Sequence, residues 1–424
     1  MLWGLGVGYV ISGMYFGWNL GLEKGGTGGM AISTLFIIVM YVTFTFGYTE
    51  LACAIPKAGG AFDYAHRALG RKWGFLAGMA QNIEFIFAPP AIAFAMGAYF
   101  QLFAPTVPIL GVAILSYILF TALNIYGVKA AATFELIITV LAVVELLIFA
   151  GVTLPHFEYD NLKLNALPNG FQGSFAAIPF AIWFFLAIEG VANVAEETIN
   201  PQKNVLIGFG SAILTLVILC ILTFLSSVGV GGWEAVVFPY PGAEASDRPL
   251  PLALRQVVGE GHFLFHLLIT IGLVGLVASF HGIILAAGRA TFEFGRVGFA
   301  PKGLGKVHSK FRTPANALLF NMLIGIVALL TGRTGEIITI ACFGALTLYI
   351  VAMLSLFALR RKEPELSRPF RVPFYPWFPA VALVIASVAL VAMIVYNPWL
   401  TLVYGGMLMV AYGYFYFFVA QIRS

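Results

Sequence analysis

The feature that most constrains this chain is a series of long apolar segments with very few charged residues. A helix needs roughly 20 mainly apolar residues to cross a bilayer. About twelve segments reach this length, and most are apolar on all sides of a helix, as expected where helices face lipid or packed neighbours. The segments cover residues 2–22, 29–54, 73–102, 107–126, 131–153, 174–195, 204–230, 262–290, 315–331, 335–359, 376–396 and 398–421. The sequence therefore predicts an all-α polytopic membrane protein.

Composition excludes several other classes of protein. Only 10% of the 424 residues are charged and 60% are hydrophobic, whereas soluble domains carry about 25% charged residues. So few ionisable groups could not cover the surface of a water-soluble protein of this length. The net charge of +4 is too weak to indicate a nucleic-acid partner. Cys53, Cys220 and Cys342 lie far apart in apolar segments, so we expect buried thiols and no metal site.

The basic residues indicate the topology. With the N-terminus in the cytoplasm, eighteen of the 23 Lys and Arg residues fall on the inner side of the predicted spans. The five on the outer side are Lys24, Lys163, Arg248, Arg255 and Arg333. Because inner loops carry an excess of basic residues, both termini are predicted to lie in the cytoplasm, which requires an even number of spans. We expect a single multi-pass domain over residues 1–424, in the plasma or inner membrane.

Two spans contain residues that disfavour a continuous helix. The first has Ser12-Gly13 near its centre, and the sixth has Glu189-Gly190. Glycine costs about 1 kcal/mol in a helix interior, and a mid-membrane Glu costs at least about 2.5 kcal/mol on insertion scales. Close helix packing is the alternative explanation for Ser12-Gly13, because small residues let backbones approach. The positions of the two spans favour interrupted helices.

Spans 1–5 and 6–10 form two successive blocks, at about 1–153 and 174–359, followed by two further spans at about 376–421. Because five is odd, the second block is inverted relative to the first. Interrupted spans at matching places in two inverted halves point to a transport site. Free N–H groups at such a break can hold an anion, and free carbonyls can hold a cation. The pattern predicts a secondary transporter with its site between spans 1 and 6.

Three long motifs carry a resemblance to a known family. They are ELACAIPKAGGAFDYAHRALG at 50–70, EGVANVAEETINP at 189–201 and GRATFEFGRVGFAPKGLGKVHSKFRTP at 288–314. In order, they resemble the loop between spans 2 and 3, the unwound sixth span and the loop between spans 8 and 9 of the amino acid–polyamine–organocation permeases. The resemblance covers essentially the whole chain. It implies the five-plus-five inverted-repeat fold and alternating access.

Within that family, three shorter motifs are similar to the ethanolamine permease branch: ISGMYFGWN at 11–19, IEFIFAPPAIA at 83–93 and PFAIWFFLAIEGV at 179–191. The family's first break is commonly Gly-Ser-Gly, but Ile11 replaces the first Gly here and crowds the N–H groups that would meet an amino-acid carboxylate. Ethanolamine permeases often carry an acidic residue where this chain has Met14. Proton-coupled members can place a Lys in mid span 5, where this chain has Ala142, with Glu145 one turn further on.

Four carboxylates lie inside predicted spans, and each is a functional candidate because a buried carboxylate is costly unless it is paired, protonated or hydrated. Glu189, at the predicted break, is expected to be a counter-charge for a cationic substrate or a gating group, or else a cap for the broken helix ends. Glu84 lies beside Pro89-Pro90 and, if it faces the site, favours an organic amine over a zwitterion. Glu145 is a candidate proton site. Glu135 is expected near a membrane face, solvated.

Span 8 carries two further candidates. His281 could titrate during coupling, although a lone His in a span is often a packing residue. Relatives that are coupled to sodium use hydroxyls on this span as ion ligands, and Ser279 is the candidate here. Trp183 and Phe184, beside the sixth break, could form part of a cation–π box.

These observations predict a permease that imports a small amine, most consistent with ethanolamine, with proton coupling favoured over sodium. The expected substrate-binding residues are Ile11, Ser12, Gly13, Met14, Glu84, Trp183, Phe184, Glu189 and Gly190, and the expected coupling residues are Glu145, Ser279 and His281. The alternatives are an amino-acid or polyamine permease and, more remotely, a membrane-embedded enzyme. No cofactor or catalytic residue is expected, and the bilayer and a small molecule are the expected partners. The sequence does not indicate an oligomeric state.

Overall fold

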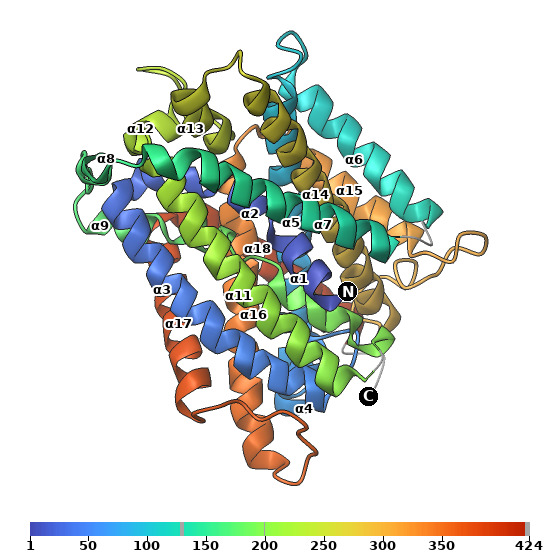
Figure 1. Ribbon diagram of the computed structural model, residues 1–424. Helices are drawn as coiled ribbons and strands as arrows, with labels where there is room; N and C mark the ends of the chain where they lie inside the picture. Colours follow the sequence, from blue (N-terminus) through green and yellow to red (C-terminus); the bar gives the residue numbers. More distant parts are fainter. Residues whose placement is uncertain (128–130, 199, 420–424) are drawn as a thin grey trace.

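The structure is a computed structural model that describes residues 1–127, 131–198 and 200–419, and in this part of the chain it contains helices and no strand (Figure 1). The helices are α1 (Leu2–Val10), α2 (Ser12–Tyr15), α3 (Trp18–Ala54), α4 (Ala61–Leu69), α5 (Arg71–Phe100), α6 (Ile109–Tyr126), α7 (Ala131–Thr153), η1 (Leu154–His156), α8 (Tyr159–Lys163), α9 (Gln172–Ala176), α10 (Ile178–Trp183), η2 (Ile188–Glu197), α11 (Pro201–Val228), α12 (Gly232–Val237), α13 (Pro249–Val258), α14 (Phe263–Arg296), α15 (Ala315–Leu329), α16 (Thr334–Lys362), α17 (Trp377–Tyr396), α18 (Pro398–Tyr414) and η3 (Phe415–Val419). The all-α class is as predicted.

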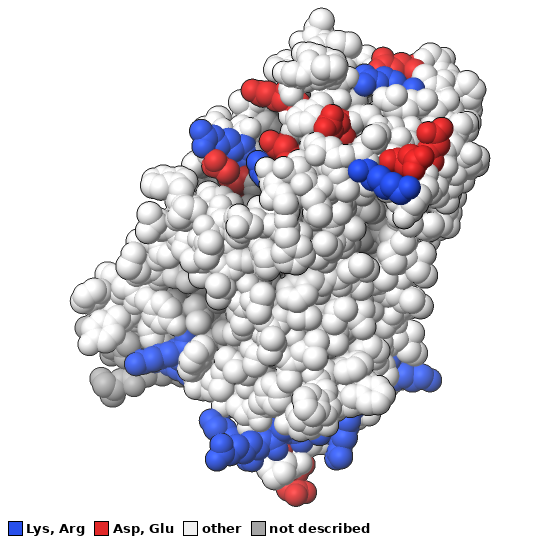
Figure 2. Space-filling model, turned by 90° about the vertical axis from the view of Figure 1, so that its left-hand side faces the viewer, with Lys and Arg blue, Asp and Glu red and all other residues white. Residues whose placement is uncertain are grey.

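Charged side chains gather at the two ends of the bundle. Figure 2 shows a broad white band between an upper end with both signs of charge and a lower end with mainly Lys and Arg. We call the end with α12 and α13 the upper end, and the end with α4 and the C-terminus of α16 the lower end (Figure 1). An uncharged band bounded by charged ends is the surface expected of a protein that spans a bilayer.

Among the described residues, nine helices are long and apolar enough to cross a membrane: α3, α5, α6, α7, α11, α14, α16, α17 and α18. The three other predicted segments correspond to shorter pieces. The first predicted span is divided among α1, α2 and the start of α3, and the sixth is divided among the end of α9, α10 and η2. Helix α15 has only 15 residues. The count of twelve spans and the inverted repeat therefore remain predictions.

Helices α5 and α16 form the most buried pair in the bundle. Their contact is close because Gly344 of α16 has no side chain. A Cβ atom there would lie 2.6 Å from the carbonyl oxygen of Ala80 and 2.8 Å from the backbone nitrogen of Glu84. This packing places the middle of α5, including Glu84, in the centre of the molecule.

One further glycine separates the first two predicted spans. Gly26 has φ 64° and ψ −172°, so the chain turns inside α3, and the residues before and after it are two different helical segments. The segment before the turn starts at Trp18 and completes the first predicted span. A positive φ of this kind is readily adopted only by glycine.

Candidate functional site

The first span is interrupted because a side chain from α14 enters its hydrogen-bond ladder. In a continuous helix, the Ser12 N–H would donate to the Gly8 carbonyl. Instead it donates to the hydroxyl oxygen of Ser279 at 3.0 Å, and that hydroxyl donates to the Gly8 carbonyl at 2.5 Å. Insertion of a side chain between donor and acceptor is a known cause of helix kinks. Ser279, a predicted coupling residue, therefore lies directly at the predicted break.

The helix stops completely four residues beyond Ser12. Phe16 is extended (φ −162°, ψ 175°) and Gly17 has φ 89°, after which α3 begins at Trp18. Four backbone N–H groups around this break have partners within the chain. Besides the bond from Ser12, Met14 N–H donates to the Ile11 carbonyl, Phe16 N–H to the Ser12 carbonyl, and Gly17 N–H to Asn19 Oδ1.

The sixth span is interrupted just before Glu189-Gly190. Helix α10 ends at Trp183, residues 184–187 are non-helical, and η2 continues from Ile188 as a tighter helix. Ala187 has φ 75°, which is uncommon for a residue with a side chain. The Ala187 N–H donates to Glu84 Oε1 at 3.2 Å. A side chain on α5 thus holds this break from outside the span.

The two breaks lie against each other. A Cβ atom on Gly13 would lie 2.5 Å from the Trp183 carbonyl oxygen and 3.0 Å from Phe184 Cα, so only glycine allows this approach. The Phe16 and Trp183 rings meet edge to face with centroids 5.4 Å apart. The Trp18 and Phe184 rings stack at 5.7 Å. The structure therefore brings together Gly13, Trp183 and Phe184, three of the predicted substrate-binding residues.

Glu84 and Glu189 meet beside the second break. Their carboxyl groups are near enough to interact electrostatically, and both side chains are completely buried. The Tyr349 hydroxyl donates to Glu189 Oε2 at 3.0 Å and lies 3.1 Å from the Tyr41 hydroxyl. No donor from the described residues reaches Glu84 Oε2 or Glu189 Oε1. Two adjacent carboxyls with unmet acceptors form a site suited to a proton or a cationic donor.

The remaining predicted binding residues line these breaks without a polar side-chain role. Ile11 and Met14 are fully buried, and the Met14 carbonyl accepts a hydrogen bond from Trp18 Nε1 at 3.1 Å. A Cβ atom on Gly190 would lie 3.0 Å from the Tyr9 ring and 3.7 Å from the Phe85 ring. Gly190 thus lets Tyr9 pack against η2.

Glu145 lies in a separate cluster with Tyr15 and Tyr99. The Tyr15 hydroxyl donates to Glu145 Oε2 at 2.7 Å, and the Tyr99 hydroxyl donates to the Tyr15 carbonyl at 2.9 Å. The Tyr15 hydroxyl is also 3.1 Å from the Ala142 carbonyl, at the position where some relatives carry a Lys. The structure does not bring Glu145 into contact with the Glu84–Glu189 pair.

His281 faces Glu135, contrary to the solvated position expected for Glu135. His281 Nδ1 lies 3.6 Å from Glu135 Oε2, and the Glu135 residue is only 3% exposed. The sequence prediction was wrong because it placed Glu135 by its distance from the end of its span. In the fold, the neighbouring helices α1 and α14 cover this side of α7.

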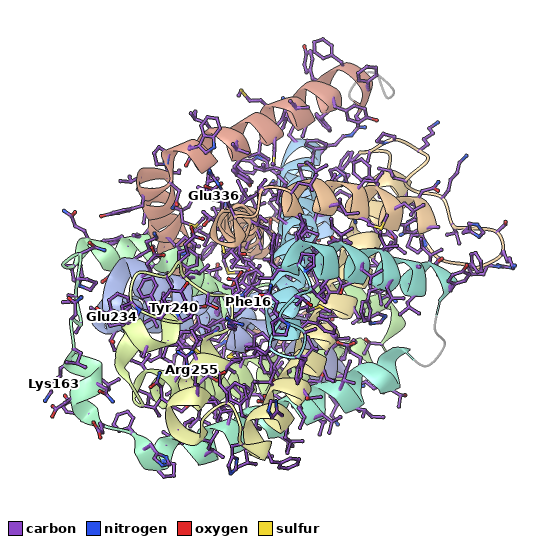
Figure 3. The ribbon with its side chains drawn as sticks, turned by 90° about the horizontal axis from the view of Figure 1, so that it is seen from above. Phe16, Lys163, Glu234, Tyr240, Arg255 and Glu336 are labelled. Carbon is purple, nitrogen blue, oxygen red and sulfur yellow. The ribbon has the colours of Figure 1, made fainter. Side chains whose placement is uncertain are left out.

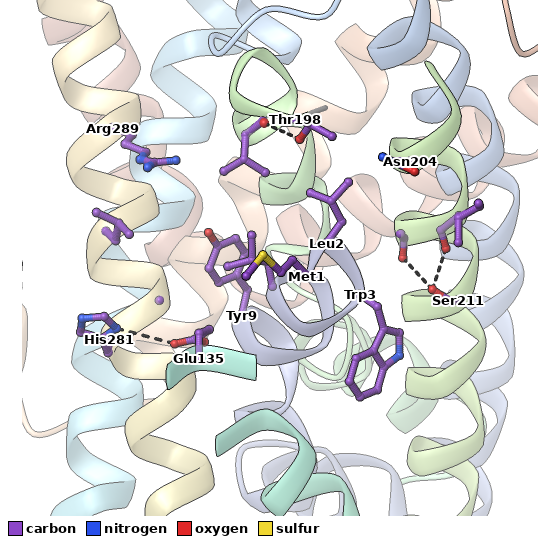
Figure 4. A pocket seen from close by; sticks show the side chains of 16 residues that line it. Met1, Leu2, Trp3, Tyr9, Glu135, Thr198, Asn204, Ser211, His281 and Arg289 are labelled. Atoms are coloured by element: carbon purple, nitrogen blue, oxygen red, sulfur yellow. Dashed lines mark hydrogen bonds and ion pairs between the residues drawn. The ribbon is translucent and has the colours of Figure 1, made fainter. Parts of the chain in front are cut away.

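Glu135 and His281 belong to the wall of a cavity of about 580 Å³ (Figure 4). The cavity lies between α1, the end of η2, and parts of α7, α11 and α14. Met1, Asn204 and Ile207 on its wall are exposed, so it reaches the surface of the molecule. We call it the lower cavity, because it lies along α1 between the first break and the N-terminus, below α2 in Figure 1. Tyr9 is on its wall and also packs against Gly190, which places Tyr9 between the lower cavity and the residue next to Glu189.

The upper side of the breaks is covered. Asn19 Nδ2 donates to the Ser246 carbonyl at 2.7 Å, and Thr334 Oγ1 donates to Asp247 Oδ2 at 2.7 Å, so the loop before α13 is tied to α3 and α16. Seen from above, Phe16 lies near the middle of the bundle, whereas Lys163 lies at its edge (Figure 3).

Burial raises the pKa of the Asp247 carboxyl to about 6, and the hydrogen bond from Thr334 partly offsets this effect.

The sequence did not indicate Tyr9, Tyr41, Tyr349 or Asn19 as site residues. Tyr41 and Tyr349 come from the second and tenth predicted spans, which carry no predicted break and whose carboxyl residues, Glu50 and Glu336, lie near the span ends. Aromatic residues make up 15% of the chain, so no local pattern distinguishes these tyrosines from packing residues. Only the fold shows that the Tyr349 hydroxyl bonds both Glu189 and the Tyr41 hydroxyl.

Comparison with known proteins gives a consistent result. A family model described as amino acid permease matches residues 3–420. The chain is 28% identical to the methylthioribose transporter of Bacillus subtilis (strain 168), over 89% of this chain and 84% of the relative. It is 26% identical to a branched-chain amino acid permease of the same organism, over 89% and 84%. It is also 26% identical to a low-affinity putrescine importer of Escherichia coli (strain K12), over 84% and 80%.

Proposed function

Because the chain belongs to the amino acid permease family, we propose that it imports a small amine, ethanolamine being the first candidate, by alternating access coupled to protons. Family and relatives are transporters of small molecules, so the chain is a multi-pass membrane permease and not an enzyme. The choice of an amine and the coupling to protons are the parts that need their own support. They rest on the chemistry of the two breaks.

The observation that carries the amine assignment is the Glu84–Glu189 pair. Two buried carboxyl groups with one unmet acceptor each offer negative charge and hydrogen-bond acceptors where the breaks meet. A primary ammonium group has three donors and one positive charge, which match both demands. A carboxylate brought to the same place would be repelled, because like charges close together in a low-dielectric site are costly. The pair therefore favours a cation over a group with negative charge.

The first break supports the same choice. An amino-acid carboxylate would need free N–H groups near Ser12 to Gly17, as the positive end of a half-helix can offer. In this structure, Ser12, Met14, Phe16 and Gly17 already donate to oxygens of the chain itself. A substrate without a carboxylate does not have to displace these bonds.

The relatives leave two substrate classes to compare. One similar protein is a putrescine importer, and putrescine is a diamine, which agrees with a carboxyl pair. Another similar protein is a branched-chain amino acid permease, which keeps an amino acid as the alternative. A measurement of uptake must therefore include both classes.

Alternating access fits the two sides of the site. The upper side is closed by the contacts of Asn19 and Asp247, while the lower cavity reaches the surface and ends at Tyr9. If the lower end is cytoplasmic, as the basic residues predict, this conformation faces inward. Glu84 and Glu189 are fully buried in it, so release of substrate requires Tyr9 to move.

The test is uptake into proteoliposomes of labelled ethanolamine, putrescine and branched-chain amino acids, each with an imposed proton or sodium gradient. We expect saturable uptake of ethanolamine that increases with a proton gradient. Saturable uptake of an amino acid without uptake of either amine would overturn the amine assignment. Dependence on sodium alone would overturn proton coupling.

The key variant is Glu189→Gln, which keeps the shape of the side chain and removes its charge. Loss of a charge-assisted hydrogen bond costs about 1.5–3 kcal/mol, so the half-saturation concentration should rise about ten- to hundred-fold. Glu336→Gln is a matched control, because Glu336 is a partly exposed residue at the upper end that pairs with Arg333. Uptake by Glu189→Gln equal to that by Glu336→Gln would limit Glu189 to a structural role.

A further inference from the structure

A buried carboxyl and an imidazole face each other on the wall of the lower cavity. Glu135 comes from α7 and His281 from α14, and Figure 4 shows them joined across the gap between these helices. Their exposed fractions are only 3% and 7%, although the cavity beside them reaches the surface. They therefore lie where a proton could pass between solvent and the protein interior.

Neighbouring residues do not satisfy the hydrogen-bonding groups of Glu135 and His281. The separation of 3.6 Å between His281 Nδ1 and Glu135 Oε2 is too long for a hydrogen bond. Among the described residues, no donor reaches either Glu135 oxygen, and His281 Nδ1 has no hydrogen-bond partner. Buried polar groups are nearly always hydrogen-bonded, so three open positions in one place indicate a site that binds something else, and a proton fits.

Few other charges act on this pair. On the described wall of the cavity, the remaining titratable or charged side chains are those of Tyr9 on α1 and Arg289 on α14. The lining residues from α11 and from the end of the sixth span are uncharged, and they are both polar (Thr198, Asn204 and Ser211) and apolar (Val194 and Ile207). From α6, the Phe120 ring faces the imidazole with centroids 6.2 Å apart. Glu145, on the same helix as Glu135, is bonded to Tyr15 in another cluster.

Glu135 also lies in the seam between α7, α1 and α14. A Cβ atom on Gly8 would lie 2.6 Å from Glu135 Oε1, and one on Gly282 would lie 3.1 Å from it. One turn further along α7, the Thr139 hydroxyl donates to the Gly4 carbonyl at 3.3 Å. The carboxyl therefore contacts α1 at Gly8, whose carbonyl accepts the Ser279 hydroxyl at the first break.

We propose that Glu135, together with His281, is the site that takes up and releases the coupled proton, and that its charge controls how α1 packs on α7 and α14. An ionised carboxylate that is only 3% exposed and has no hydrogen-bond donor among the described residues is costly, whereas a neutral carboxyl costs much less. Uptake of a proton therefore favours the closed seam, and release of the proton favours a hydrated, open lower cavity. The inference rests on the proposed coupling to protons, but not on the identity of the substrate.

The first test separates coupling from substrate movement. We expect Glu135→Gln in proteoliposomes to retain counterflow exchange of whichever substrate the unmodified protein carries. Its accumulation driven by a pH gradient should fall to the level without a gradient. A gradient of one pH unit supports at most about tenfold accumulation at one proton per substrate, so the loss is measurable. Glu336→Gln is again the matched control for the substitution.

The outcomes distinguish this inference from the proposed function. If the unmodified protein carries a substrate without any response to a pH gradient, proton coupling fails, and this inference fails with it. If the unmodified protein responds and Glu135→Gln responds equally, only the inference fails. His281→Gln should weaken the response and shift its dependence on pH, and an unchanged profile in that variant would exclude His281 from the site.

A second measurement needs no transport and applies even if Glu135→Gln is inactive. Difference infrared spectroscopy of the purified protein, without substrate, detects the C=O stretch of a protonated carboxyl as pH changes. We expect one such titrating band to be absent in Glu135→Gln and to shift its midpoint in His281→Gln. Glu145→Gln is the control, because it removes a buried carboxyl from the same helix and should leave that band in place. The same titrating bands in Glu135→Gln and the unmodified protein would overturn the proposal.

Discussion

Replacement of Gly13 by Ala tests whether the contact between the two breaks is as close as the structure indicates. The added Cβ atom would lie 2.5 Å from the Trp183 carbonyl oxygen and 3.0 Å from Phe184 Cα. Ordinary contacts of a Cβ atom begin near 3.4 Å. Both neighbours are backbone atoms that cannot rotate away, so α2 and the end of α10 must separate by about 0.9 Å at this point.

The expected cost follows from this overlap. Overpacking of a well-packed core typically costs 1–3 kcal/mol. The matched control is Gly210→Ala in α11, where no atom lies within 4 Å of the added Cβ. At that position Ala should stabilise the helix by about 0.5–1 kcal/mol relative to Gly. The two variants should therefore differ in the free energy of unfolding by about 1.5–4 kcal/mol.

The assay is thermal or denaturant unfolding of both purified variants in the same detergent, followed by uptake in proteoliposomes. Gly13→Ala should unfold more readily than the unmodified protein. It should also show reduced uptake, because the added Cβ displaces the end of α10, which carries Trp183 and Phe184 at the proposed site. Gly210→Ala should be at least as stable as the unmodified protein. Equal stability and equal uptake of the two variants would refute the close contact between the breaks.

Two further predictions concern the first break and the upper closure. Ser279→Ala should let the Ser12 N–H donate directly to a carbonyl of its own helix, so that one hydrogen bond replaces two. The free energy of unfolding should fall by about 0.5–1.5 kcal/mol, and hydrogen exchange at the Ser12 amide should slow. Faster exchange at this amide would contradict this account. The pKa of Asp247 is raised from its usual 3.8 to about 6, so as pH falls from about 6 toward 4 this carboxyl binds a proton in the folded protein but not in the unfolded chain. Asp247 should therefore add stability as pH falls from 7 toward 4, by up to about 1.4 kcal/mol per pH unit, and Asp247→Asn should remove this gain in unfolding curves measured across that range.

The sequence predicted the helices well because the signal for a span is local. Long apolar segments give helices such as α5 and α16 regardless of their partners, since backbone groups in a bilayer must bond within the segment. The breaks were placed less accurately. They were predicted at Ser12-Gly13 and Glu189-Gly190, while the helices are interrupted at residues 11 and 16–17 in the first span and at residues 184–187 in the sixth. Local helix propensity identifies a segment that disfavours a continuous helix, but not the residue at which the helix is interrupted.

The residue at which a helix is interrupted depends on hydrogen bonds from side chains that are distant in sequence. Ser279 reaches the first break from α14, and Glu84 reaches the second from α5. The same reason explains the wrong environment expected for Glu135, whose burial is produced by α1 and α14 rather than by its own span. A single sequence contains no record of these contacts.

Burial alone does not distinguish the carboxyl groups proposed here as functional from the other buried carboxyl groups. What distinguishes them is a carboxyl oxygen without a hydrogen-bond donor among the described residues. Glu145 and Glu135 lie on the same helix and are both buried, but Glu145 accepts a short bond from Tyr15, and no donor among the described residues reaches Glu135. Glu50 is equally buried and accepts bonds from Arg360 and from the backbone N–H of Val372. Satisfied carboxyls of this kind fasten helices together, because removing their partners would leave a buried charge. The unmet acceptors at Glu84, Glu189 and Glu135 can each accept a hydrogen bond from a mobile donor, which is the property that the proposed binding of an amine or a proton requires.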